Sequence, residues 1–341
     1  MENYTENNNK KSSLAANIFY VVLGLFTILF LLTSPTLGSL HVKDFPPKDP
    51  VLKNDPTKSI YLGQGCFWHT QYDFFHIENS NEEYFNARSY KNITSLVGYA
   101  GGNYVSGADK AVCYHGAIHK DYNKLGHAEA VSIELSYPKG ANIIDSQTLG
   151  QFRLLINHYF KHGYTTLPNG QRQRLDPQDV GAEYRNIIGI PDGMNNKIFY
   201  NEIIRANQEY GMKLIEGKGS NFGDIEGEFI VYIYDSKEFP FFRAENYHQF
   251  HTNDVLKREL PLSYVQDVKR IQSDIGRLEK NPGCPESSGS LMTLVNFALI
   301  IAGIVSMLRG IINIVNIVYN DWRIKEKKVT HLDDINNSSN N

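Results

Sequence analysis

The chain has 341 residues, of which 34 are Lys or Arg and 37 are Asp or Glu, giving a formal net charge of −3 at pH 7. This balance gives no sign of the basic surface that nucleic-acid-binding proteins carry. With 41% hydrophobic and 12% aromatic residues, the composition is typical of a folded globular chain. The three cysteines are too few for a disulfide scaffold, and their odd number indicates at least one free or reactive thiol.

Two apolar segments predict that the chain is anchored in a membrane. Residues 14–33 open with an uncharged run that is long enough for a helix to cross a bilayer. This run is longer than the apolar core of most signal peptides, which favours an uncleaved anchor over a cleaved signal. Residues 291–319 are the second predicted transmembrane segment, interrupted by Arg309 and followed by a basic cluster typical of a stop-transfer span.

The charges beside these segments predict an orientation. Lys10 and Lys11 precede the first segment, and the basic cluster follows the second. Because basic residues concentrate on the cytoplasmic side, both tails are expected there. The domain between the anchors is then expected on the non-cytoplasmic side of a membrane that the sequence does not identify.

The region between the anchors mixes strand and helix patterns. Strands are expected at residues 59–63, 128–135 and 229–234. Helices are expected at residues 68–77, 146–162 and 192–216, the last with Asp192 as its N-cap. This mixture predicts one α+β domain. Apolar residues at helical spacing over 265–278 predict an amphipathic helix that packs between the core and the membrane.

The chain therefore divides into seven predicted segments. They are a disordered tail (1–13), a transmembrane or signal-anchor helix (14–33), a Pro-rich linker (34–57), a catalytic domain (58–260), an amphipathic helix with a Cys-bearing tail (261–290), a transmembrane segment (291–319) and a basic, then Asn-rich tail (320–341).

The sequence Gly-Cys-Phe-Trp at residues 65–68 is the first motif that carries chemistry. It follows a predicted strand and opens a predicted helix, so Cys66 is expected at a helix N-terminus. The unpaired N–H groups and the positive end of the dipole there favour a thiolate. Most buried cysteines are inert, however, so this motif alone predicts only a candidate nucleophile.

Four further motifs follow in order along the chain. They are Val-Gly-Tyr-Ala-Gly-Gly at 97–102, Gly-His-Ala-Glu-Ala at 126–130, Asp-Pro at 176–177 followed by Asp-Val-Gly-Ala-Glu-Tyr-Arg at 179–185, and Ala-Glu-Asn-Tyr-His-Gln at 244–249. With the cysteine motif, this set resembles the peptide methionine sulfoxide reductase A family over residues 58–251. The resemblance implies a two-layer mixed sheet with helices, and the reduction of methionine S-sulfoxide, free or in proteins, to methionine. Such an enzyme repairs oxidised proteins.

The resemblance also implies roles for individual residues. Cys66 would attack the sulfoxide sulfur and become a sulfenic acid, and Glu129 would donate the proton, which requires a raised pKa. The remaining implied roles are these: Asp179 orients the site, Tyr184 holds the sulfoxide oxygen, and Phe67 and Trp68 receive the S-methyl group. From the residues alone, a solvent-facing strand residue is the favoured interpretation of Glu129. Tyr184 and Asp179 could equally be core or turn residues, and the aromatic pair could be core.

A second thiol is needed to reset the sulfenic acid. Cys284 follows an Asn-Pro-Gly turn after the core and is the candidate resolving thiol, with Cys113 as the runner-up. The disulfide would be opened by an external, thioredoxin-like dithiol through exchange. No bound cofactor and no metal are expected.

The chain departs from the family pattern at three positions. Asp109 stands where the family commonly has a tyrosine that contacts the sulfoxide oxygen, so one of two expected hydroxyls is missing. Three tyrosines are open as replacements: Tyr104, Tyr114 and Tyr122. Gln71 and Asn246 replace a common glutamate and a common aspartate.

Three other functions fit parts of the sequence. A Cys/His acyl-transfer enzyme would use His127 or His248 as its base. A membrane-tethered, non-catalytic binder of oxidised methionine would use the same pocket but would not turn over its ligand. A metal site is the weakest alternative and rests on two histidine pairs spaced by four residues: His115 with His119, and His158 with His162.

Overall fold

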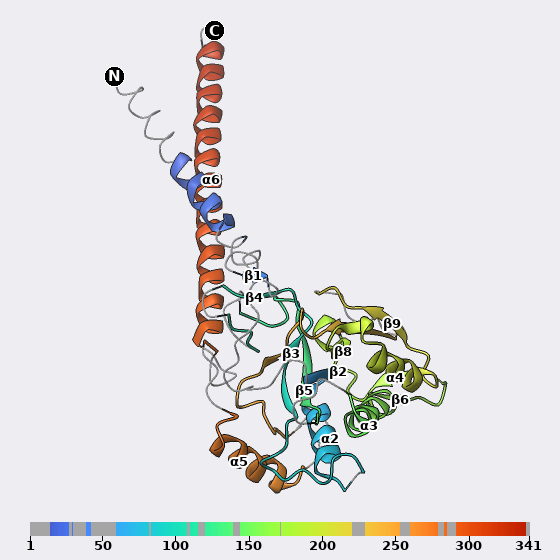
Figure 1. Cartoon of the computed structure of the whole chain (residues 1–341). Helices are drawn as coiled ribbons and strands as arrows, with labels where there is room; N and C mark the ends of the chain where they lie inside the picture. The colour runs from blue at the N-terminus through green and yellow to red at the C-terminus, as the bar shows by residue number, and fades with distance from the viewer. Residues whose placement is uncertain are drawn as a thin grey trace. The chain divides into compact units, whose positions relative to one another are not determined.

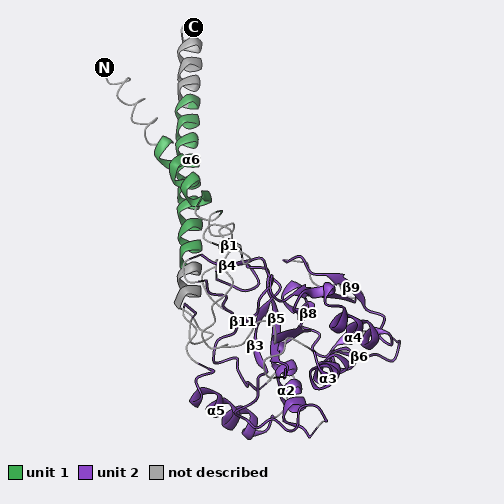
Figure 2. Cartoon of the chain, viewed as in Figure 1, with its two compact units in different colours: residues 1–34, 291–341 green, residues 35–290 purple. Residues whose placement is uncertain are grey.

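A computed structural model describes residues 14–26, 29, 39–41, 59–81, 83–107, 110–114, 120–138, 144–170, 172–219, 229–252, 260–278, 283–284 and 291–338. The chain forms two compact units (Figure 2). One comprises Pro35–Ser290, and the other comprises Met1–Ser34 together with Leu291–Asn341.

A mixed seven-stranded sheet is the centre of the larger unit (Figure 1), which is therefore an α/β mixture of the predicted kind. Its spatial order is β11 (Phe242–Arg243), β3 (Leu96–Ala100), β5 (Ala128–Glu134), β2 (Ser59–Gly63), β8 (Asn186–Ile190), β10 (Ile230–Asp235) and β9 (Lys213–Glu216). The pairs from β11 to β8 are antiparallel, and β8, β10 and β9 run parallel. The middle strands are buried along almost their whole length, as expected for a sheet covered on both faces.

The register of the middle strands positions two residues of interest. β3 pairs with β5 so that Tyr99 lies opposite Glu129. β5 pairs with β2 so that Val131 lies opposite Leu62, next to the end of β2 at Gly63. The carboxyl group of Glu129 and the turn that carries Cys66 therefore arise from neighbouring strands.

Three helices pack with this sheet. α2 (Phe67–Asn79) follows β2, α3 (Ser146–His162) is capped by Asp145, and α4 (Lys197–Asn207) packs on α3 with the Phe152 and Phe199 rings 4.3 Å apart. The first two helices lie where the sequence predicts them.

The predicted helix over 192–216 is wrong at both ends. Asp192 lies in a left-handed turn with φ of 65°, and the side chain of Asn196 caps α4 instead. The helix ends at Asn207, and a turn at Gly211, with φ of +62°, leads into edge strand β9. Short apolar runs do not distinguish helix from strand by periodicity, which explains the error.

The predicted amphipathic helix over 265–278 forms as two pieces and a final turn. A π-helical segment (Ser263–Val268) continues into α5 (Lys269–Asp274). Tyr264, Val268 and Leu278 bury their side chains against residues of α2, which include Tyr72 and Phe75. This segment is therefore a packing element of the core.

Gln71 and Asn246 both tie this C-terminal segment to the core. Gln71 is fully buried, and its amide oxygen accepts hydrogen bonds from Phe250 N and the Tyr264 hydroxyl. The Asn246 amide donates to the carbonyl of Leu278 at 2.5 Å. Neutral amides suit these positions because each both donates and accepts.

The remaining elements of the larger unit are short. They are β1 (Ser39–His41) paired with β4 (Tyr104–Ser106), β6 (Tyr164–Thr166) paired with β7 (Arg172–Arg174), and single 3₁₀ turns at Ala182–Tyr184 and Gly193–Asn195.

Among its described residues, the smaller unit contains one helix that is long and apolar enough to cross a membrane. It is the stretch Ala298–Glu326, 29 residues within α6 (Leu291–Ser338). The other apolar helix in this unit, Leu14–Phe26, is shorter than a span needs. The prediction of two spans is thus supported for one of them. Of the rest of predicted segment 14–33, only Leu29 lies within the described residues.

These two helices pack against each other in antiparallel register. The Asn313 amide donates to Asn17 Oδ1 at 3.1 Å. Further along, a Cβ added to Gly310 would lie 2.7 Å from Val21, and one added to Gly24 would lie 2.7 Å from a carbonyl oxygen of α6. The glycines therefore allow a close approach of the two helices, as small residues do in membrane helix pairs.

Candidate active site

The turn between β2 and α2 presents the free thiol of Cys66. Gly65 has φ of +70°, a conformation that glycine adopts without strain, and its N–H donates to the carbonyl of Tyr184 at 3.0 Å. A Cβ at this position would also lie 2.9 Å from Asp179 Oδ2. The glycine of the cysteine motif is thus required both by the turn and by the close approach of Asp179.

Two carboxylates occupy the N-terminus of α2. The N–H of Cys66 donates to Asp179 Oδ2 at 2.9 Å, and the N–H of Phe67 donates to Glu129 Oε2 at 2.9 Å. These are N–H groups that a helix leaves unpaired at its start. The structure therefore brings Cys66, Glu129 and Asp179 together from three distant parts of the chain.

Burial changes the acid–base behaviour of both carboxyl groups. The pKa of Glu129 is raised to about 8, mainly by burial, although hydrogen bonds from Phe67 N–H and the Tyr122 hydroxyl lower it in part. Burial also raises the pKa of Asp179 to about 6. At neutral pH Glu129 is therefore mostly a neutral acid, and Asp179 is mostly ionised.

The expectation of a resting thiolate at Cys66 is wrong. The pKa of the Cys66 thiol is raised, first by burial and then by Glu129 and Asp179. The N–H groups of Trp68 and His69 lower this pKa, but by less. The N–H groups of Cys66 and Phe67 bind the carboxyl groups of Asp179 and Glu129 instead of the sulfur. The helix N-terminus therefore does not offset the effect of burial on the thiol pKa.

Aromatic side chains form one wall of the site. Phe67 is buried, with its ring centroid 6.1 Å from that of Trp68 and 5.2 Å from that of His248. Trp68 lies 4.5 Å from His251, and its indole nitrogen is buried with no acceptor among the described residues. The predicted aromatic pair thus belongs to a larger cluster, whose two histidines the sequence did not assign to substrate binding.

Two tyrosine side chains lie near the carboxyl group of Glu129. The Tyr122 hydroxyl donates to Glu129 Oε1 at 3.3 Å. Tyr184 ends the 3₁₀ turn Ala182–Tyr184, and its pKa is raised by burial and then by Glu129 and Tyr114. Glu129 therefore has a donor on each oxygen and a second tyrosine nearby.

Arg185 fixes the backbone around these groups, a role that the sequence did not suggest. Its side chain is completely buried and donates to the carbonyls of Ala182, Gly101 and Gly126. The carbonyl of Ala182 precedes Tyr184, that of Gly101 follows β3, and that of Gly126 precedes β5. A signal was present, because Arg185 ends the motif at 179–185.

The two candidate resolving thiols are bonded to each other. Cys113 and Cys284 form a disulfide that joins positions 171 residues apart, with their Cα atoms separated by 5.6 Å. The carboxylate of Glu245 lies within 4.8 Å of both sulfurs. It also accepts hydrogen bonds from Tyr114 N at 2.9 Å and from the Tyr99 hydroxyl at 2.8 Å. The sequence did not predict this pairing, nor a role for Glu245.

The structure weighs against His127 as a general base. Its Nδ1 accepts from Gly102 N at 3.1 Å, and its Nε2 lies 2.7 Å from the carbonyl of Tyr104, to which only an N–H can donate. Burial lowers the pKa of His127 to about 3. Both nitrogens of this neutral ring are therefore engaged by the backbone.

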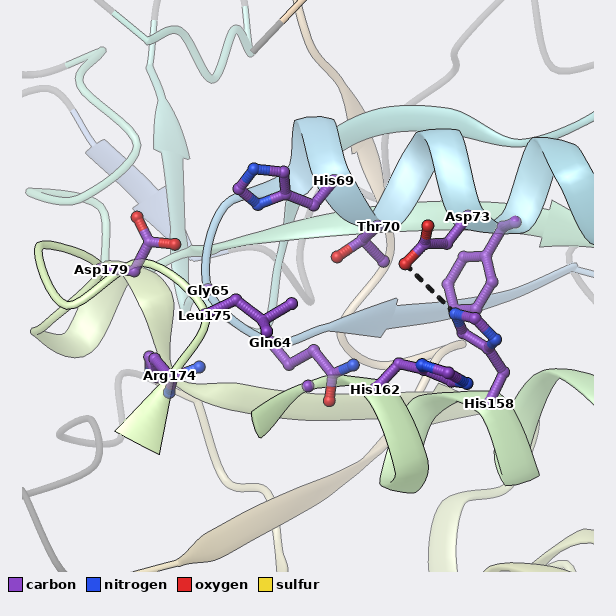
Figure 3. Close-up of a pocket in the computed structure, with 12 residues that line it drawn as sticks. Gln64, Gly65, His69, Thr70, Asp73, His158, His162, Arg174, Leu175 and Asp179 are labelled. Atoms are coloured by element: carbon purple, nitrogen blue, oxygen red, sulfur yellow. Dashed lines mark hydrogen bonds and ion pairs between the residues drawn. The ribbon is translucent and has the colours of Figure 1, made fainter. Parts of the chain in front are cut away.

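A pocket beside the cysteine turn contains the histidine pair considered for a metal (Figure 3). His158 lies 3.2 Å from Asp73, and its ring stacks on that of His162 at 4.1 Å. Gly65 and Asp179 also line this pocket, so it adjoins the thiol turn. The second pair, His115 and His119, lies outside the described residues, as does Asp109.

No protein-family model matches the chain. Among solved structures, methionine sulfoxide reductase A of Corynebacterium diphtheriae is similar, with a TM-score of 0.33 and 15% sequence identity over 61% of this chain and 80% of that chain. This likeness is distant and concerns the fold at most, so the function of this chain has to be argued from its own residues.

Proposed function

We propose that the chain is a thiol-dependent reductase of methionine S-sulfoxide, free or in proteins. One observation carries the proposal: the free thiol of Cys66 and the buried carboxyl group of Glu129 lie at one helix start, where Phe67 N donates to Glu129 Oε2. Burial raises the pKa of that carboxyl group to about 8. Reduction of a sulfoxide needs a nucleophile at sulfur and an acid at oxygen, and these two groups supply that pair.

The proposed reaction balances with one thiol and one acid. Cys66 sulfur attacks the sulfoxide sulfur while Glu129 gives its proton to the oxygen, and the proton lost by the thiol restores Glu129. The S–O bond then breaks as oxygen passes to Cys66, which leaves methionine and a sulfenic acid at Cys66. A thiol with a raised pKa is compatible with this sequence because its proton replaces the one that Glu129 donates.

Other residues would set specificity in this proposal. The faces of Phe67 and Trp68 would receive the S-methyl group, since thioethers and methyl groups pack well on aromatic rings. Asp179 would hold the cysteine turn through Cys66 N, and Tyr184 would bind the oxygen. Attack and protonation from fixed sides would select the S over the R sulfoxide.

The Cys113–Cys284 disulfide would be the product of the step that returns Cys66 to a thiol. Cys284 thiol would condense with the Cys66 sulfenic acid, releasing water and forming a mixed disulfide. Cys113 thiol would then displace Cys66 to give the Cys113–Cys284 bond. An external dithiol, such as a thioredoxin-like protein, would reduce that bond and become a disulfide itself. The support is that the two candidate thiols are close enough to be bonded.

Membrane attachment is a further part of the proposal. The stretch Ala298–Glu326 would span the bilayer and hold the catalytic unit on the non-cytoplasmic side. Protease treatment of sealed vesicles from the cytoplasmic side tests this orientation. The unit Pro35–Ser290 is expected to be protected, and its digestion in intact vesicles would overturn the orientation.

The activity is tested with full-length protein in detergent, dithiothreitol, and methionine S- or R-sulfoxide. We expect one methionine per dithiol consumed with the S form and none with the R form, and loss of both signals in Cys66→Ser. Hydrolysis of esters or amides by the wild type would favour an acyl-transfer enzyme. Binding of the S-sulfoxide without dithiol consumption would leave a non-catalytic binder.

A further inference from the structure

Three tyrosine rings form a continuous stack beside Glu129. The Tyr99 and Tyr122 centroids are 4.6 Å apart and those of Tyr122 and Tyr114 are 5.5 Å apart, with 20° between the planes in each pair. Tyr99 is fully buried, Tyr122 is 5% exposed and Tyr114 is half-buried. The stack therefore begins in strand β3 and ends with Tyr114 as the member that a ligand can reach.

The inner hydroxyls bind two different carboxyl groups. Tyr122 donates to Glu129 Oε1 at 3.3 Å, while Tyr99 donates to Glu245 Oε2 at 2.8 Å. The other oxygen of Glu129 accepts from Phe67 N. Glu129 is thus held from both sides, once by the helix start and once by Tyr122.

The outer hydroxyl belongs to Tyr114 and lies close to the reacting groups. It hydrogen-bonds the side chain of Tyr184, and the pKa of Tyr114 is raised to about 12 by burial and then by Glu129 and Cys66. The residue is anchored from behind, because its N–H donates to Glu245 Oε1 and its ring lies 4.4 Å from that of His248. Tyr114 is therefore held in place beside Tyr184, with Glu129 and Cys66 close enough to raise its pKa.

The third candidate, Tyr104, is placed differently. It lies on β4, pairs with His41 of β1 and is 37% exposed. Its contact with the motif residues is through its carbonyl oxygen, which accepts from His127. The three rings of the stack are those of Tyr99, Tyr122 and Tyr114.

We propose that Tyr114 supplies the hydroxyl that a tyrosine at position 109 would otherwise provide. Tyr114 binds the sulfoxide oxygen together with Tyr184, and Tyr122 is a positioning residue that holds Glu129. This inference rests on the proposed reduction of methionine S-sulfoxide, and it names which residues complete that site. Two neutral hydroxyls with raised pKa values remain donors at physiological pH, as stabilisation of a developing charge on oxygen requires.

Three Tyr→Phe variants of the full-length protein test the proposal, since each keeps its ring and removes one hydroxyl. Tyr114→Phe is expected to lower kcat by about 100- to 1000-fold, the range for loss of one donor to a developing oxyanion, with KM changed less than about threefold. Tyr104→Phe is the matched control and is expected to keep wild-type kcat. Wild-type kcat in Tyr114→Phe, or an equal loss in Tyr104→Phe, would overturn the assignment.

The effect of Tyr122→Phe is measured in the pH dependence of kcat. Its hydroxyl lowers the pKa of Glu129, so its removal raises that pKa and moves the alkaline limb of kcat to higher pH. Tyr114→Phe is expected to leave the limb in place. An unmoved limb in Tyr122→Phe, or a move to lower pH, would show that Tyr122 does not hold the acid.

A second measurement separates this inference from the proposed function. The rate of Cys66 alkylation by iodoacetamide against pH reports ionisation of Glu129, because that carboxylate raises the pKa of the thiol. A shifted profile in Tyr122→Phe is expected even without turnover. If wild-type protein fails to reduce the sulfoxide, the proposed function falls together with the role of Tyr114. If wild-type protein turns over and the tyrosine variants match it in both assays, only this inference falls.

Discussion

The two halves of the candidate site are built in different ways. Cys66, Glu129 and Asp179 are held by N–H groups at the start of α2 and by a central strand. Tyr114 and Tyr122 lie between β4 and β5, outside the named helices and strands, and Tyr114 follows a cysteine whose disulfide reaches residue 284. In the proposed mechanism, the acid and the nucleophile thus depend on regular elements, whereas the oxygen-binding side depends on a connecting segment. Connecting segments vary more readily in sequence than the elements they join.

The largest effect is expected in the half of the site that is built on regular elements. Cys66→Ser removes the nucleophile, so sulfoxide reduction should fall by at least about a thousandfold. Release of methionine, measured by chromatography, checks this. Cys113→Ser, assayed for a single turnover, is the matched control, and full activity in Cys66→Ser would rule out Cys66 as the nucleophile.

Glu129→Gln tests the acid without changing its shape. The amide still accepts from Phe67 N but donates no proton to the sulfoxide oxygen, so kcat should fall by about 100- to 1000-fold. Glu245→Gln is the control, since that carboxyl group binds Tyr99 and Tyr114 rather than the helix start. A smaller loss in Glu129→Gln than in Glu245→Gln would contradict the assignment.

The pH dependence sharpens the same assignment. Because burial raises the pKa of Glu129 to about 8, its donor form is present below that pH and is lost above it. The single-turnover rate should therefore fall about tenfold for each pH unit above about 8. Stopped-flow measurements from pH 6 to 10 check this. A rate that rises steadily with pH would mean that formation of the Cys66 thiolate, and not protonation, limits the reaction.

Asp179→Asn should have a smaller effect on activity, and it should make the thiol of Cys66 easier to ionise. The amide oxygen can still accept from Cys66 N, but the charge that raises the thiol pKa is gone. We expect the pKa of Cys66 to fall. The pH dependence of alkylation measures it, and an increase in that pKa would show that Asp179 does not act on the sulfur.

Cys113→Ser combined with Cys284→Ser should change the first turnover least of all. These residues serve resetting in the proposal, so one methionine per protein should still form at the wild-type rate. The free energy of unfolding should drop by about 2–4 kcal/mol because the closed loop is long. Denaturant unfolding checks the stability. Loss of the first turnover would place the disulfide in the chemistry itself.

The sequence predicts the regular half of the site better than the irregular half. The motif at 65–68 places Cys66 at a helix start, and the motif at 126–130 places Glu129 on a strand, because both depend on local patterns. The pairing of Cys113 with Cys284 depends on a contact across 171 residues, which local patterns do not encode. The choice between Tyr104, Tyr114 and Tyr122 likewise needs the path of a connection without periodicity.

The errors have physical reasons too. The predicted thiolate fails because hydrogen bonds from the start of α2 go to carboxylates and because burial opposes charge at Cys66. The helix predicted over 192–216 fails because strand β9 pairs with β10, a tertiary contact that overrides a weak local signal.

The central claim is that Cys66 takes the oxygen from methionine S-sulfoxide. Its direct test is a single turnover of dithiol-reduced Cys113→Ser, Cys284→Ser protein with that sulfoxide, followed by dimedone and mass spectrometry. The account predicts one methionine released per protein and one dimedone adduct at Cys66, with neither product from the R-sulfoxide. Methionine formed without the adduct, or an adduct formed equally with both sulfoxides, would contradict it.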